Sequence, residues 1–179
     1  MLVRRPIPIL CGLLAVCVVA FLGWDFFQLS RRVPAPAADQ ADLIRVDKSA
    51  RTLTLLRGSQ ILKTYAVALG SAPIGPKARE GDGRTPEGQY EIDSRNARSH
   101  FHLALHISYP DANDRTRAQQ AGVPAGGDIM VHGLPNGLGW LGKLHQWRDW
   151  TDGCIAVTNP EMDEIWSLVK PHTAIEIIP

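Results

Sequence analysis

Hydrophobic and polar residues alternate along much of the chain after residue 42, and this pattern predicts β-strands. The stretch 100–108 shows it most clearly, because Phe101, Leu103, Leu105 and Ile107 would face the core while the residues between them face away. The first three predicted strands follow one another through short turns, which favours an antiparallel meander. The predicted strands cover residues 43–46, 52–56, 61–69, 89–92, 100–108, 129–131 and 174–178.

Two helices are expected among these strands. Residues 111–122 have the composition of a polar surface helix closed by a glycine. The second helix should begin with Asn159 as its N-cap and Pro160 at its first position. Its buried side is expected to contain Met162, Ile165, Trp166 and Val169. Together these elements predict a mainly β fold, a sandwich or barrel with one or two helices.

A long connection separates the third and fourth predicted strands. Residues 70–88 (GSAPIGPKAREGDGRTPEG) contain too many glycines and prolines for a regular element, and loops of this length are usually functional or mobile. Lys77, Arg79 and Arg84 are expected to be solvated here. Arg84 is also a candidate for contact with an anionic substrate.

The N-terminal residues follow a different pattern. Arg4 and Arg5 precede an uncharged run from Pro6 to Trp24 that is about long enough to span a bilayer as a helix. The basic pair favours an exported domain, although a second arginine pair at residues 31–32 weakens the asymmetry. The length of the run favours a retained anchor over a cleaved signal peptide.

The predicted organisation therefore has three parts. Residues 1–29 would form a single-pass anchor in the cell inner membrane, and residues 30–42 a Pro/Ala linker. Residues 43–179 would form a domain in the periplasm. The net charge of +1 gives no indication of a nucleic-acid partner.

The cysteines distinguish the exported domain further. The chain has three cysteines, and Cys154 alone lies outside the N-terminal hydrophobic run. Oxidising compartments favour paired cysteines, and Cys154 has no partner in the exported part. A free buried cysteine can be inert, but an unpaired one in an exported domain favours a chemical role.

His132 and Cys154 carry the candidate chemistry. His132 follows a predicted strand, and a Gly/Trp-rich loop then leads to Cys154. A thiol attacks as its thiolate, and an imidazole that titrates near neutrality can take the thiol proton. Gly133 leaves room for a close approach, and its carbonyl could orient the histidine ring. The backbone N–H groups of Asp152, Gly153 and Cys154 could stabilise an oxyanion.

These residues resemble a known catalytic signature. Val131-His132-Gly133 followed by Thr151-Asp152-Gly153-Cys154-Ile155 is similar to the motif of the L,D-transpeptidases, the YkuD-type domain. The likeness covers about residues 43–179, including the opening IRVDKSARTLTLLRGSQILKTYAVALG and the segment GDGRTPEGQYEI.

The resemblance implies a mainly β fold and a cysteine acyltransferase without a metal or cofactor. In this family the cysteine attacks the carbonyl of the L-centred residue in a peptidoglycan stem tetrapeptide and releases D-alanine. The acyl group then passes to an amine of another stem, to a lipoprotein or to water. By position, Cys154 would be the nucleophile and His132 the general base oriented by the Gly133 carbonyl. The N–H groups of Asp152, Gly153 and Cys154 would form the oxyanion hole.

Two positions differ from the family pattern. The family usually has histidine where Asp152 stands, and often arginine or asparagine where Ala156 stands. A carboxylate beside the thiol should raise its pKa unless a cation such as Arg148 or Lys143 neutralises it. The acceptor therefore stays open, and an L,D-carboxypeptidase or a murein–lipoprotein hydrolase is an alternative. A non-catalytic wall-binding module is the alternative from another class.

Histidine-rich and aromatic residues supply the remaining candidates. A zinc amidase would need clustered ligands, but His102 and His106 on one strand would lie about 13 Å apart, too far to share an ion. Trp140, Trp147 and Trp150 would either line a substrate groove or anchor their loop. Arg148 belongs to the same group of candidate substrate contacts.

Overall fold

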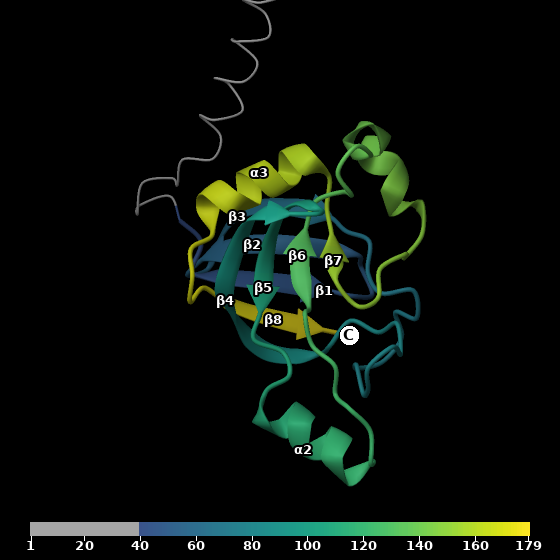
Figure 1. Cartoon of the computed structure of the whole chain (residues 1–179). Coiled ribbons are helices and arrows are strands. Elements are labelled where there is room, and N and C mark those ends of the chain that lie inside the picture. The colour runs from purple at the N-terminus through teal and green to yellow at the C-terminus, as the bar shows by residue number, and fades with distance from the viewer. Residues whose placement is uncertain (1–39) are drawn as a thin grey trace, which may run out of the picture. The chain divides into compact units, whose positions relative to one another are not determined.

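In the computed structural model, which describes residues 40–179, eight strands of that part of the chain form one mixed sheet (Figure 1). Their order is β3-β2-β1-β8-β4-β5-β6-β7. The strands are β1 (Leu43–Asp47), β2 (Thr52–Arg57), β3 (Gln60–Ala66), β4 (Gly88–Ser99), β5 (His102–Ile107), β6 (Met130–His132), β7 (Ile155–Ala156) and β8 (Ala174–Ile178). The mainly β prediction is confirmed.

The first three strands form the predicted antiparallel meander. β1 pairs with β2, and β2 pairs with β3, through a turn in which Gly58 has φ +55°. The last strand of the chain, β8, then inserts between β1 and β4. It runs parallel to β1 and antiparallel to β4. The C-terminal strand therefore joins the meander to the half of the sheet that contains β5, β6 and β7.

β4 is much longer than the predicted strand at residues 89–92. Its first part pairs with β8 and its second part with β5, with register shifts between Ile92 and Ser94 and between Asn96 and Ser99. The second part contains mostly exposed polar residues. No apolar alternation marks this half, so the hydrophobic pattern ended the strand too early.

Both predicted helices are present, and one has a different cap. α2 (Ala112–Gln120) begins at Asp111, which forms a capping box with Asp114. α3 (Asn159–Leu168) is capped by Thr158, not by Asn159. The Thr158 side chain accepts the Glu161 N–H, and the Glu161 carboxylate accepts the N–H of the cap, so the four-residue box outweighs the preference of asparagine for this position.

The core lies between the sheet and α3, which crosses one end of the sheet, whereas α2 lies at the other end (Figure 1). The predicted stripe of α3, Met162, Ile165, Trp166 and Val169, is buried in it. Every residue of the core cluster lies between Ala41 and Ile177, and all described residues belong to one compact unit. Residues 40–179 therefore contain a complete hydrophobic core and should fold without the N-terminal residues.

The predicted membrane anchor, residues 1–29, lies outside the described residues, as does most of the predicted linker, residues 30–42. Within residues 40–179, no helix has both the length and the hydrophobicity that a bilayer span requires. The loop before Cys154 contains an unpredicted 3₁₀ segment, η2 (Gly139–Trp147), which is interrupted at Gly142 with φ 48°.

Candidate active site

Cys154 and His132 lie at neighbouring strand ends. β6 and β7 run parallel, with Val131 opposite Ile155 and His132 opposite Ala156. Cys154 directly precedes β7 and lies two residues before Ala156, so its side chain projects from the same face of the sheet as His132. The spacing of strands and residues puts the two Cα atoms about 8 Å apart on the diagonal, within reach of both side chains.

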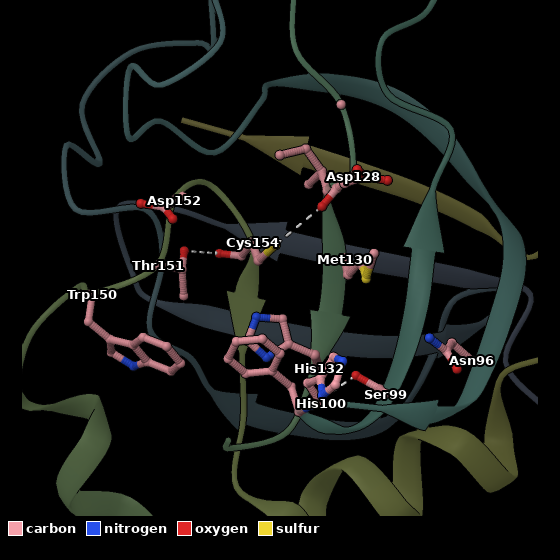
Figure 2. A pocket seen from close by; sticks show the side chains of 13 residues that line it. Asn96, Ser99, His100, Asp128, Met130, His132, Trp150, Thr151, Asp152 and Cys154 are labelled. Carbon is pink, nitrogen blue, oxygen red and sulfur yellow. Dashed lines mark hydrogen bonds between the residues drawn. The ribbon is translucent and has the colours of Figure 1, made fainter. Parts of the chain in front are cut away.

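Both side chains enter one pocket of about 440 Å³ (Figure 2). Its apolar lining residues are Phe101, Ile129, Met130 and Trp150. Polar residues from the end of β4, from the turn before β5 and from the loops beside Cys154 complete the wall; they are Asn96, Ser99, His100, Asp128, Thr151 and Asp152. The pocket therefore combines an apolar base with a polar rim around the thiol.

A hydrogen bond to the Gly133 carbonyl determines which ring nitrogen of His132 carries the proton. Nδ1 of His132 lies 2.6 Å from the carbonyl oxygen of Gly133, and because a carbonyl can only accept, Nδ1 must donate. In the neutral ring, Nε2 is then the free acceptor. The ring is buried against Phe101 at a centroid distance of 4.6 Å and meets Trp150 edge-on at 6.0 Å.

Burial keeps His132 neutral. Desolvation lowers the pKa of His132, the nearby His145 lowers it further, and the bond to Gly133 only partly opposes them. An imidazole with a lowered pKa is unprotonated at neutral pH, so Nε2 can accept a proton. The arrangement suits a general base.

The thiol is protonated in the same resting state. Burial raises the pKa of Cys154, a hydrogen bond from the Met130 N–H opposes the shift, and the charges of Asp152 and Asp128 raise the pKa further. The Asp152 effect has the predicted direction. Sγ of Cys154 donates to the Asp128 carbonyl at 3.5 Å. The pocket therefore contains a neutral base and a neutral thiol, and the thiol is bonded to the Asp128 carbonyl.

The cation that favours the Cys154 thiolate is Lys77, and neither Arg148 nor Lys143, the predicted candidates, is among the charges that act on this thiol. Lys77 is buried, with 5% of its surface exposed, and pairs with Asp82 at 2.9 Å. The prediction that Lys77 is solvated was therefore wrong. The sequence places Asp82 five residues later but gives no sign that both are buried.

The backbone around Cys154 is held by Thr151. Oγ1 of Thr151 donates to the Cys154 carbonyl at 2.7 Å and accepts the Gly153 N–H at 3.2 Å. The Gly153 N–H, one of the three predicted oxyanion donors, is thus engaged within the protein. The N–H groups of Asp152 and Cys154 have no acceptor among the hydrogen bonds of residues 40–179.

At two positions near the site, neighbouring atoms leave no room for a side chain larger than that of glycine. A Cβ at Gly153, which has φ +128°, would lie 2.5 Å from the backbone oxygen of Arg84. A Cβ at Gly133 would lie 2.7 Å from Oδ1 of Asn159, which accepts the Leu134 N–H at 2.8 Å. Asn159 therefore ties the start of α3 to the strand end that orients His132. The sequence suggested Asn159 only as a helix cap.

The structure places the predicted substrate-contact residues at different sites. Trp150 lines the pocket, while Trp147 and Arg148 line a neighbouring groove together with Trp150. Trp140 is 75% exposed and belongs to neither lining. Arg84 donates to the Pro76 carbonyl at 3.4 Å and is not among the residues that line the pocket.

The strand histidines have carboxylate partners. Nε2 of His102 lies 2.9 Å from Asp163, and Nδ1 of His106 lies 2.6 Å from Asp93. Among residues 40–179, no group of three or more histidine, cysteine, aspartate or glutamate residues is placed to hold a metal ion.

Comparisons with known proteins place this site in context. The family model described as the L,D-transpeptidase catalytic domain, YkuD, matches residues 41–177. A relative in Escherichia coli K12, described as "Putative L,D-transpeptidase YafK", is 26% identical over 193 residues, which cover 98% of this chain and 71% of the relative.

Solved structures agree with the fold. The helical cell shape determining protein Pgp2 from Campylobacter jejuni (K307A mutant) matches with a TM-score of 0.58 and 21% identity, over 86% of this chain and 53% of that one. Bd1075 from Bdellovibrio bacteriovorus matches with a TM-score of 0.54 and 25% identity, over 82% and 50%. The chain therefore spans about half the length of these two structures.

Proposed function

Because the chain belongs to the YkuD family of L,D-transpeptidase catalytic domains, we propose that it is a cysteine acyltransferase acting on peptidoglycan stem peptides. The observation that supports this most is the shared pocket of Cys154 and His132, with the His132 tautomer fixed by Gly133. The acyl group would be carried as a thioester on Cys154.

In the first half-reaction, Nε2 of His132 takes the thiol proton as Sγ of Cys154 attacks the carbonyl carbon of the L-centred stem residue. The N–H groups of Asp152 and Cys154 donate to the oxyanion of the tetrahedral intermediate. Collapse breaks the C–N bond, and the imidazolium Nε2–H protonates the departing amine of D-alanine. The thioester and a neutral His132 remain.

The second half-reaction transfers the acyl group. An acceptor amine attacks the thioester carbonyl and gives its proton to Nε2 of His132. Collapse breaks the C–S bond, and the proton returns to the Cys154 thiolate. If water attacks in place of the amine, the products are a free carboxylate and the thiol, which corresponds to an L,D-carboxypeptidase.

Charge at the pocket mouth favours a cationic peptide. Asp152 is exposed, and the Asp128 side chain is 92% exposed. Both act on the thiol electrostatically and would attract an ammonium group, whether from a stem peptide or from a lysine of a wall-attached lipoprotein.

Incubation of the protein with purified muropeptides tests this function by the masses of the products. Cross-linked dimers indicate transfer to a stem, shortened stems indicate hydrolysis, and lipoprotein-bearing muropeptides that lose their peptide indicate release of the lipoprotein. Cys154→Ala and His132→Ala should abolish each product. His172→Ala, which changes an exposed histidine outside the pocket lining, is the matched control. Full turnover by Cys154→Ala would indicate another nucleophile, whereas full cellular function of Cys154→Ala without any turnover would indicate a non-catalytic wall-binding module.

We also propose that residues 1–29 anchor the protein in the cell inner membrane with the catalytic domain in the periplasm. The basic pair before the uncharged run supports this orientation. Such a location would give access to the wall, whose remodelling would connect the activity to cell shape, the process named for the Campylobacter relative. Protease digestion of spheroplasts should remove the domain, and protection of the domain would contradict the orientation.

A further inference from the structure

A second groove lies directly beside the active-site pocket. It has a volume of about 400 Å³, and its apolar lining residues are Leu134, Pro135, Leu138, Leu141, Leu144, Trp147 and Trp150. Trp150 also lines the Cys154 pocket, so the two hollows share one indole ring. We refer to this hollow, formed by residues 134–150, as the η2 groove.

The surface around the η2 groove is unusually apolar. Leu138, Trp140, Leu144 and Trp147 are 42%, 75%, 52% and 84% exposed. Within residues 40–179, these are four of the six large hydrophobic side chains that are exposed, and all four lie on one short segment. Concentrated exposed hydrophobic residues mark an interaction site more often than an inert surface.

The same segment is cationic. Lys143 and Arg148 are exposed, and residues 138–148 contain no aspartate or glutamate. The next residue, Asp149, is bound to Arg51 at 2.9 Å and to the Leu69 N–H at 2.8 Å, so its charge is already paired. The groove and its surrounding segment therefore present apolar rings and positive charge, whereas the exposed carboxylates of Asp152 and Asp128 belong to the neighbouring pocket.

His145 is part of the groove wall and is held there by Trp150. Its Nδ1 accepts the Trp150 indole N–H at 3.3 Å, so in the neutral ring the proton resides on Nε2. That Nε2 is buried and has no partner among the described residues. Trp150 therefore fixes the His145 ring in the groove wall, and the buried Nε2 is shielded from a docking ligand.

We propose that the η2 groove and its exposed tryptophans form a docking surface for a bilayer that contains anionic lipids. Tryptophan prefers the membrane–water interface, and leucine side chains can enter the acyl boundary below it. Lys143 and Arg148 would lie among the lipid phosphates. A glycan strand fits less well, because the groove offers few polar groups to its hydroxyls.

The predicted chain architecture supplies a second reason. The sequence predicts an anchor within residues 1–29 and a linker at residues 30–42. Ala41 and Asp42 belong to the domain, so the remaining linker residues, 30–39, would span about 30 Å in a polyproline II conformation, at about 3.1 Å per residue. A domain confined so close to a bilayer would meet it at a high effective concentration, so weak contacts through the η2 groove would suffice. Docking would then hold the Cys154 pocket beside the membrane surface.

The test measures cosedimentation of residues 40–179, which contain the complete core, with vesicles of phosphatidylcholine alone or mixed with phosphatidylglycerol. The double variant Trp140→Ser/Trp147→Ser should bind the mixed vesicles about tenfold or more weakly. The control variant Ile61→Ser/Ile74→Ser changes side chains that are 64% and 86% exposed but lie outside the groove, and it should bind as the unmodified domain does.

The charged residues give an independent measurement. Lys143→Gln/Arg148→Gln should weaken binding to the mixed vesicles by about fivefold for each charge, with little effect on neutral vesicles. In full-length protein reconstituted in vesicles, brominated lipids should quench tryptophan fluorescence less in the Trp140→Ser/Trp147→Ser variant than in the unmodified protein.

Several results would overturn the proposal. They are the absence of binding to either vesicle, equal binding by the tryptophan and isoleucine variants, and a dimer in solution that only the tryptophan variant abolishes. Binding to isolated wall strands but not to vesicles would identify a different occupant. None of these measurements uses turnover, so they are independent of the proposed acyl transfer.

Discussion

Replacing Asp82 with asparagine should destabilise the domain more than any other single carboxylate-to-amide change in the loop at residues 70–88. Asp82 pairs with Lys77 at 2.9 Å, and their side chains are 8% and 3% exposed. It also accepts the backbone N–H groups of Ala78, Arg79 and Arg84 at 2.7, 3.1 and 3.1 Å. One carboxylate therefore organises the turn and neutralises a buried cation.

The size of the stability loss can be derived from the Lys77 charge that remains in the variant. Asparagine preserves an acceptor for part of the backbone network but leaves the Lys77 ammonium buried without a counter-charge. Loss of one partner of a buried pair costs about 3–5 kcal/mol. Since the amide keeps some hydrogen bonds, we expect a loss of about 3 kcal/mol in the free energy of unfolding. For a domain of this size, that loss lowers Tm by roughly 10 °C.

The stabilisation contributed by the Asp82 carboxylate should be lost at low pH. Burial alone would raise the pKa of Asp82, but the bonds from Ala78, Lys77, Arg84 and Arg79 outweigh it and lower the pKa from 3.8 to about 2. A lowered folded-state pKa stabilises the fold fully above the unfolded value and is lost as the pH falls through the folded value. The difference between wild type and Asp82→Asn should therefore shrink between about pH 4 and pH 2.

Urea unfolding of residues 40–179 at several pH values measures both quantities. Asp42→Asn is the matched control, because Asp42 is exposed and accepts only the Gly58 N–H at 2.8 Å. A change of about 0.5 kcal/mol or less is expected there. Equal losses for Asp82→Asn and Asp42→Asn, or a difference that persists unchanged to pH 2, would refute the role assigned to the Lys77–Asp82 pair.

Three further changes test the site and the core. Asp152→Asn should lower the pH midpoint for alkylation of Cys154 by iodoacetamide, because it removes a charge that raises the thiol pKa; an unchanged midpoint would exclude this influence. Gly133→Ala should lower kcat about tenfold or more with a small change in KM, because it displaces the carbonyl that orients His132. A normal kcat would show that the position of this carbonyl is not critical. Met162→Ala should cost about 2–5 kcal/mol in denaturant unfolding, because Met162 is fully buried; a loss below 1 kcal/mol would mean that the core closes around the cavity.

Local patterns in the sequence predicted what depends on local structure. The antiparallel meander, the buried stripe of α3 and the order of the motif around His132 and Cys154 can each be read from neighbouring residues. The motif placed both candidate groups correctly in one pocket. The parallel pairing of β6 and β7, which puts them on one face, required the structure.

Long-range pairings explain what the sequence could not provide. The exposed half of β4 is a strand because β5 pairs with it, although its residues lack an apolar period. Lys77 and Asp82 look like surface charges until the folded loop buries them. The Gly153 N–H is unavailable because Thr151 reaches back to it, a contact that depends on the turn conformation.

The most direct test of the central claim is the intact mass of the folded protein after exposure to a carbapenem, followed by peptide mapping. Opening of the β-lactam ring by a nucleophilic Cys154 should add the whole mass of one carbapenem at that residue. His132→Ala should slow the addition at neutral pH by about a hundredfold or more, because the thiol then lacks its base. An adduct elsewhere, no adduct on the folded protein, or an unchanged rate in His132→Ala would contradict a cysteine nucleophile activated by His132.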